Sequence, residues 1–197
     1  MLDLRGRVVL VVGAGPIATR KVEGLVREGA VVRVVAPEVS SEMTAFVAEH
    51  AEVVTIERRP YALADLAGVR LVITATNDTA VQQAVFDDGE RLGVWVNAAD
   101  DPDRCAFILP AVHRRGAVTI AVSTGGASPA LAQWLRDRMR AALPEDLDAL
   151  VSELTERRLA FKASGASTES IDWRPVIEEL HAGSGAGRAA ASPSDEP

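Results

Sequence analysis

The sequence has one cysteine, no long apolar run and a deficit of positive charge. A single cysteine, Cys105, excludes an internal disulfide and any metal site built from several cysteines, which is typical of a reducing compartment. No apolar run approaches the roughly 20 residues of a membrane span, and the N-terminal residues lack a secretory signal. We therefore expect a cytoplasmic protein with no membrane attachment. The formal net charge of −7 argues against nucleic acid as the main partner.

Two further kinds of site are also missing from the sequence. His50 and His181 have no potential ligand at i+3 or i+4, so we predict no metal site. The sole tyrosine, Tyr61, is followed at i+4 by Asp65, which excludes the Tyr-x-x-x-Lys pair of short-chain ketoreductases. Cys105 stands in an apolar stretch, and we expect a small buried residue there rather than a reactive thiol.

Strand-like runs rich in valine alternate with helical patterns through the first half of the chain. Hydrophobic residues make up 48% of the sequence, which is enough for one substantial core. The predicted strands cover residues 8–12, 31–36, 53–56, 71–76 and 94–97, and the predicted helices cover residues 16–29, 41–50 and 79–92. This alternation predicts an α/β fold with a doubly wound parallel sheet.

The first predicted strand passes directly into a Gly-x-Gly-x-x-Ala turn. Gly13 would allow the sharp turn, Gly15 would let the backbone approach a pyrophosphate, and Ala18 would keep the next helix close to the sheet. Pro16 suits the first helical turn, because the N–H that it lacks has no helical acceptor there. The pattern favours a Rossmann-like dinucleotide site at a helix N-terminus. An ordinary strand–turn–helix corner is the alternative.

Acidic residues follow the second and fifth predicted strands. Glu38 lies 20 residues beyond Ala18, where a dinucleotide fold places the carboxylate that binds ribose hydroxyls, and this would favour NAD over NADP. It could equally be a solvated acid that assists the start of the helix near Ser40. Asp100 or Asp101 could act as a base beside the nicotinamide, although Asp-Asp-Pro is also ordinary turn chemistry.

The pattern changes after the fifth strand. Residues 107–109 and 117–122 predict a β-hairpin with its turn at residues 113–116, followed by a glycine loop and by a helix that Ser128 caps. Helical patterns recur at residues 145–162 and 173–181. We predict an NAD-binding domain over residues 1–112, a dimerisation and substrate-cleft domain over 113–145, a C-terminal helical region over 146–182, and a disordered tail over 183–197.

The glycine loop and the hairpin turn offer groups that could bind an anion. Ser123, Thr124 and Gly125 would present hydroxyls and backbone N–H groups ahead of a helix. The alternative is a capping loop that needs glycine for its geometry. His113 could meet a carboxylated ligand, although a histidine in a hairpin turn is commonly just solvated.

Three stretches together resemble one family. They are residues 13–21 (GAGPIATRK), residues 97–111 (NAADDPDRCAFILPA) and residues 122–132 (VSTGGASPALA). In this order they resemble the precorrin-2 dehydrogenase module of siroheme synthases, and the resemblance extends over about residues 1–180.

The resemblance implies NAD-dependent oxidation of precorrin-2 to sirohydrochlorin by a homodimer formed through the hairpin and the C-terminal helices. Some members also insert ferrous iron, so a ferrochelatase activity is a further expectation. The family's key aspartate corresponds to Asp100. The implied cofactor contacts are Gly13, Ala14, Gly15, Pro16, Ile17, Pro37 and Glu38, with Thr76 and Asn97 near the nicotinamide. A non-catalytic NAD-sensing module that acts through its C-terminal helices is the alternative.

Overall fold

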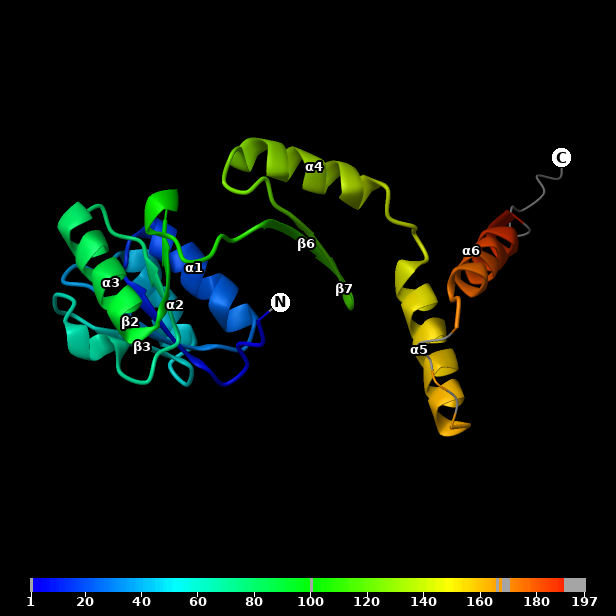
Figure 1. Ribbon diagram of the computed structural model, residues 1–197, viewed down its shortest axis with the longest axis horizontal. Helices are drawn as coiled ribbons and strands as arrows, with labels where there is room; N and C mark the ends of the chain where they lie inside the picture. Colours follow the sequence, from blue (N-terminus) through cyan, green and yellow to red (C-terminus); the bar gives the residue numbers. More distant parts are fainter. Residues whose placement is uncertain (1, 100, 166, 168–170, 190–197) are drawn as a thin grey trace, which may run out of the picture. The chain divides into compact units, whose positions relative to one another are not determined.

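The computed structural model describes residues 2–99, 101–165, 167 and 171–189, and the chain divides into two compact units between Leu109 and Pro110 (Figure 1). The predicted boundary after residue 112 lies close to this division. The finer division of residues 113–182 stays a prediction. In the part of the chain that is described, no helix has the length and apolar character that crossing a membrane requires.

The first unit is the predicted parallel sheet with helices on both faces. Its five strands lie in the order β3-β2-β1-β4-β5, and every neighbouring pair is parallel. The elements are β1 (Val8–Val12), α1 (Pro16–Arg27), β2 (Val31–Val35), α2 (Ser41–Glu49), β3 (Val54–Glu57), η1 (Leu63–Leu66), β4 (Leu71–Thr74), α3 (Thr79–Leu92), β5 (Trp95–Ala98) and η2 (Pro102–Arg104). This is the doubly wound topology that the strand and helix alternation predicts.

The valine-rich strands form these elements because both faces of the sheet are covered. On one face, Val9 and Val11 pack with Ala18 of α1 and Met43 of α2. On the other face, Leu10 and Val12 pack with side chains of η1 and α3. A strand that is buried on both sides needs a continuous apolar run rather than an alternating one, which is what the sequence contains.

The predicted helix starts are confirmed. Pro16 occupies the first turn of α1. The Ser40 hydroxyl accepts a hydrogen bond from the Met43 backbone N–H at 3.2 Å and so caps α2. Ser128 caps α4 (Pro129–Ala141) in the same way, by accepting from the Leu131 N–H at 3.2 Å. Local capping chemistry therefore determines where these helices begin.

The second unit contains an antiparallel hairpin, β6 (Ala111–Arg115) and β7 (Val118–Val122), which contacts α4 on both strands. Two further helices, α5 (Leu147–Ala163) and α6 (Arg174–Ala189), contact each other. The Arg115 guanidinium donates to the Pro144 carbonyl at 2.7 Å and so joins the hairpin to the segment that precedes α5.

The predicted hairpin is present, but its first strand and its turn lie at other residues than predicted. Residues 113–115 lie within β6, so His113 is a strand residue and not a turn residue. The turn consists of Gly116, at φ 51°, and Ala117. Phe107 is not in the hairpin because its carbonyl accepts from the Asn97 side chain at 2.8 Å and its ring packs against the core of the first unit.

The last helix is longer than predicted. We expected it to end at His181 and disorder to begin at residue 183, but α6 continues to Ala189. Residues 184–189 thus have helical backbone, and the rest of the predicted tail, residues 190–197, lies outside the described residues.

A cluster of charged residues, Glu57, Arg59 and Asp65, lies at and after the end of β3. Asp65 is 4% exposed and accepts two hydrogen bonds from the Arg59 guanidinium, at 2.5 and 2.9 Å. The Ala62 backbone N–H donates to the same carboxylate at 2.9 Å. The Arg59 guanidinium, opposed in part by burial, holds the pKa of the Asp65 carboxyl below its usual value.

We expect Asp65→Ala to lower the free energy of unfolding by about 2 kcal/mol, because it removes the buried carboxylate that accepts from the Arg59 guanidinium and from the Ala62 N–H. Glu57→Ala, on the exposed side of the same Arg59, is the control and should cost less than about 1 kcal/mol. Chemical denaturation of both variants measures the difference. Since the pKa of Asp65 is lowered on folding, its contribution is complete at neutral pH and is lost as the pH falls below about 4. Equal losses in the two variants at pH 7 would contradict this assignment.

Candidate functional site

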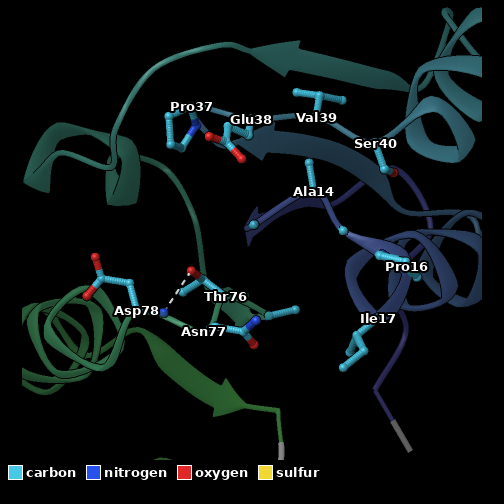
Figure 2. Close-up of a pocket in the computed structure, with 13 residues that line it drawn as sticks. Ala14, Pro16, Ile17, Pro37, Glu38, Val39, Ser40, Thr76, Asn77 and Asp78 are labelled. Atoms are coloured by element: carbon cyan, nitrogen blue, oxygen red, sulfur yellow. Dashed lines mark hydrogen bonds between the residues drawn. The ribbon is translucent and has the colours of Figure 1, made fainter.

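A pocket of about 530 Å³ lies where β1, β2 and β4 end. Figure 2 shows the segment that follows β2 on one side of this pocket and the segment that follows β4 on the opposite side. The lining residues are Gly13, Ala14, Gly15, Pro16, Ile17, Pro37, Glu38, Val39, Ser40, Ala75, Thr76, Asn77 and Asp78. Eight of the nine predicted cofactor contacts are therefore brought together, since Asn97 alone is missing from this set.

Gly13 is required by both its backbone and its surroundings. Its φ is +111°, a conformation that residues with a Cβ rarely adopt. A Cβ at this position would lie 2.3 Å from the Ala75 carbonyl oxygen, so the chain after β4 passes directly against the glycine. The expected sharp turn is present. The absence of a side chain at Gly13 also leaves room for the loop that follows β4.

Gly15 begins α1 and leaves the helix N-terminus open toward the pocket. Its own Cβ position has no atom within 4 Å, and no side chain caps α1. The two other helices that begin beside this pocket are capped, α2 by Ser40 and α3 by Asp78. Unsatisfied N–H groups and the positive end of the helix dipole therefore face the pocket at α1, which fits the pyrophosphate of a dinucleotide.

Each of the two opposite walls of the pocket, formed by the segments after β2 and after β4, contains an acidic residue. Glu38 lies on one wall, beside Pro37, and Asp78 lies on the other (Figure 2). Among the described residues that line the pocket there is no Lys, Arg or His. The charges of this pocket thus favour an anionic group at the start of α1 and uncharged groups near Glu38 and Asp78.

The wall after β4 is built by hydrogen bonds within and behind the loop. The Thr76 hydroxyl accepts from the Asp78 backbone N–H at 3.2 Å. Behind the loop, the Gln82 side chain donates to the Thr76 carbonyl at 2.6 Å. Val39, Asn77 and Asp78 also line the pocket, although they were not among the predicted contacts and no motif marks them.

The corner after β5 is held by side chains that face inward. Asn97 is buried, and its amide donates to the Phe107 carbonyl, so it supports the corner and does not line the pocket. The Cys105 thiol donates to the carbonyls of Ala98 and Asp101 at 3.2 and 3.1 Å. Cys105 is half-buried rather than fully buried as expected, and burial raises the pKa of its thiol, as suits a structural cysteine. Asp100 lies outside the described residues.

The carboxylate of Asp101, the other acid considered as a base, is already engaged. It forms an ion pair with the Arg104 guanidinium, three residues along the chain. Arg104 in turn donates to the Gln83 side chain of α3 at 2.8 Å. Asp101 therefore helps to shape the corner.

The predicted substrate contacts lie in the second unit. The Thr124 hydroxyl donates to the Ser128 carbonyl and accepts from the Ser128 backbone N–H, both at 3.0 Å. The Ser123 hydroxyl accepts from the Gly125 N–H at 3.2 Å. These bonds shape the loop before α4, and the substrate contact of Thr124 stays a prediction. Within the described residues, no cluster of three or more His, Cys, Asp or Glu could hold a metal ion.

The fold and the pocket together define a class of protein. A parallel sheet in the order β3-β2-β1-β4-β5, with a glycine turn and an open helix N-terminus at its carboxyl edge, is a Rossmann-like dinucleotide-binding domain. Residues 1–111 match the family model described as "Putative NAD(P)-binding", and residues 115–142 match the model described as "Sirohaem biosynthesis protein central".

Comparison with individual proteins identifies the family within this class. The structure of "SirC, precorrin-2 dehydrogenase" is 33% identical, with a TM-score of 0.69, over 92% of this chain and 86% of that one. The siroheme synthase of Actinobacillus pleuropneumoniae serotype 7 (strain AP76) is 38% identical over 82% of this chain, and siroheme synthase 2 of Aeromonas salmonicida (strain A449) is 40% identical over 91%. The chain spans 33% and 41% of the length of these two synthases. It belongs to the precorrin-2 dehydrogenase family, whose module siroheme synthases also contain.

We expect Gly13→Ala to lower the free energy of unfolding by about 2 kcal/mol or more, because the methyl group meets the Ala75 carbonyl in a strained backbone conformation. Gly15→Ala is the matched control. Its φ of −84° suits alanine and its Cβ position is open, so its stability should stay within about 0.5 kcal/mol of the wild type. Thermal or urea unfolding of both variants tests this, and similar losses in both would contradict the contact described above.

Proposed function

We propose that this protein oxidises precorrin-2 to sirohydrochlorin, with NAD as the hydride acceptor. The observation that carries the proposal is the pocket in which Gly13 turns the chain and α1 presents an uncapped N-terminus, in a chain that shares 33% identity with SirC. When bound, NAD supplies the oxidising equivalent by taking a hydride at its nicotinamide ring. Because the chain spans about a third to two fifths of the synthases, the proposal concerns this one module.

The charge of the pocket supports NAD rather than NADP. Glu38 would accept hydrogen bonds from the ribose hydroxyls of the adenosine, and its carboxylate would repel a 2′-phosphate. No basic side chain is present among the described lining residues to compensate for that repulsion. The α1 N-terminus, between Gly15 and Ile17, would hold the pyrophosphate.

The proton that accompanies the hydride needs a base or a stabilising charge. We assign this role to Asp100, which would take the proton or stabilise the positive charge that develops on the pyrrole system as the hydride departs. Asn97 would act from behind the same corner by holding its backbone. We retain Thr76, on the pocket wall, as a contact near the nicotinamide.

The second unit would bind the carboxylates of the tetrapyrrole and form the homodimer. His113 on β6 and the Ser123 to Gly125 loop are the proposed substrate contacts. The Thr124 hydroxyl is engaged with Ser128, so the loop would offer mainly backbone N–H groups. Exposed Leu131, Trp134 and Met139 on α4 give this unit an apolar surface that suits a second copy of the chain.

The spectrum of the purified protein mixed with precorrin-2 and NAD tests the proposed reaction. Growth of the sirohydrochlorin bands together with NADH absorbance is the expected result. Tight NADH binding without any oxidation would favour the NAD-sensing alternative. Metal insertion remains an expectation from the resemblance, and loss of the sirohydrochlorin bands on addition of ferrous ion would establish it.

Replacement of Glu38 should alter cofactor choice. We expect Glu38→Ala to weaken NAD binding about tenfold through loss of charged hydrogen bonds to the ribose, and to reduce the preference for NAD over NADP. Glu42→Ala, which removes an exposed carboxylate from the first turn of α2, is the charge-matched control and should change neither quantity. Isothermal titration with both cofactors gives the answer, and an unchanged preference in Glu38→Ala would exclude the assigned role.

Removal of the proposed base should affect turnover. Asp100→Ala is expected to lower kcat by roughly 100-fold or more with little change in NAD affinity, because a general base acts in the transition state. Asp103→Ala, at an exposed acid of η2, is the control and should retain near-normal kcat. Steady-state NADH formation with precorrin-2 measures both, and near-normal turnover in Asp100→Ala would rule out this role.

A further inference from the structure

A buried side chain lies directly behind the pocket wall. Gln82 of α3 is 8% exposed and is absent from the lining residues, yet its amide donates to the Thr76 carbonyl at 2.6 Å. We propose that Gln82 is a positioning residue of the dinucleotide site, which holds the segment from Ala75 to Asp78 in the place that completes the pocket. The inference rests on the proposed NAD site and assigns to it a residue that no motif marks.

The attachments of this segment explain why one amide matters. At its beginning, the Ala75 N–H donates to the Val12 carbonyl at 2.8 Å, and at its end Asp78 caps α3. Between these points, the Thr76 hydroxyl bonds to Asp78 within the same segment and so gives no external anchor. In the described part of the chain, the hydrogen bond from the Gln82 side-chain amide connects the middle of the segment to α3.

The position of this segment affects the whole pocket. Its first residue, Ala75, touches the Cβ-free side of Gly13, so a shift of the segment alters the space above the glycine turn. Its other residues form the wall that faces Glu38 (Figure 2). Because Gln82 is 8% exposed, its amide has little access to water that could replace the Thr76 carbonyl, which favours the bond between them. Loss of the amide would thus widen the range of positions that the wall can occupy and weaken ligand binding.

The next residue supplies a matched control. Gln83 is the same residue type on the same helix, but its side chain accepts from Arg104, in η2 after β5. It also donates to Asp87 at 2.8 Å, one turn along α3. Gln83 therefore supports a different loop, and its replacement should leave the pocket wall unchanged.

The experiment compares Gln82→Met with Gln83→Met in the full chain, since methionine keeps the side-chain length and removes the amide. Two measurements are made on each variant: the Kd for NAD by calorimetry, and amide hydrogen exchange of residues 75–78 without cofactor. We expect Gln82→Met to raise the Kd about five- to tenfold and to accelerate exchange in this segment. The KM for NAD should rise by a similar factor, with kcat at saturating NAD and precorrin-2 within about twofold of the wild type. Gln83→Met should show neither a higher Kd nor faster exchange there.

The outcomes separate this inference from the proposed function. Failure of the wild type to bind NAD would overturn the proposed function, while the exchange data would still test the role of Gln82. Unchanged NAD affinity or unchanged exchange in Gln82→Met would overturn the inference, and so would equal effects in both variants. If Gln82→Met does not fold, Gln82→Asn serves in its place. It keeps the amide but is one methylene shorter, so the amide would not reach the Thr76 carbonyl. Wild-type affinity for NAD in that variant would contradict the proposed role of the Gln82–Thr76 hydrogen bond.

Discussion

The contact between Gly13 and the Ala75 carbonyl determines how the ends of β1 and β4 fit together. At 2.3 Å from the position of a Cβ, the carbonyl leaves room for glycine and for no other residue without a shift. The same glycine, at a positive φ, turns the chain from β1 into α1. One residue thus brings the helix N-terminus and the opposite wall to a single pocket, and the remaining features of the site depend on that approach.

Electrostatics in this pocket are local and differ from the charge of the whole protein. The chain carries a formal net charge of −7, which by itself repels anions. A local attraction for anions arises at the first turn of α1, where no side chain satisfies the backbone N–H groups. Ser40 and Asp78 cap the neighbouring helices and remove the same attraction there. The distribution of caps therefore favours α1 over α2 and α3 as the place for an anion. The selection of the group beside it is the role that we propose for Glu38.

Residues behind the lining layer organise the carboxyl edge of the sheet. Gln82 supports the segment after β4, while Gln83, through Arg104, supports the corner after β5. Asn97 and the Cys105 thiol stabilise that corner from within. Adjacent residues of one helix thus serve two loops, because successive side chains on a helix project in different directions.

Features with a local chemical cause were predictable from the sequence: the Gly13 turn, the caps at Ser40 and Ser128, and the buried parallel strands. The turn and the caps depend on the residue itself or on residues within one turn of it, and the buried strands are visible in the sequence as continuous apolar runs. Three features were not predictable in this way. They are the positions of the first hairpin strand and its turn, the inward-facing side chain of Asn97, and the hydrogen bonds of the Thr124 hydroxyl to Ser128. Each depends on a partner that only folding brings near, such as the Phe107 carbonyl for Asn97. The sequence by itself determined the fold class and the position of the glycine turn, because apolar runs, helical periodicity and the backbone freedom of glycine are properties of the local sequence. Tertiary structure alone decided which side chains line the pocket and which support it from behind, because that choice depends on how the ends of separate strands meet.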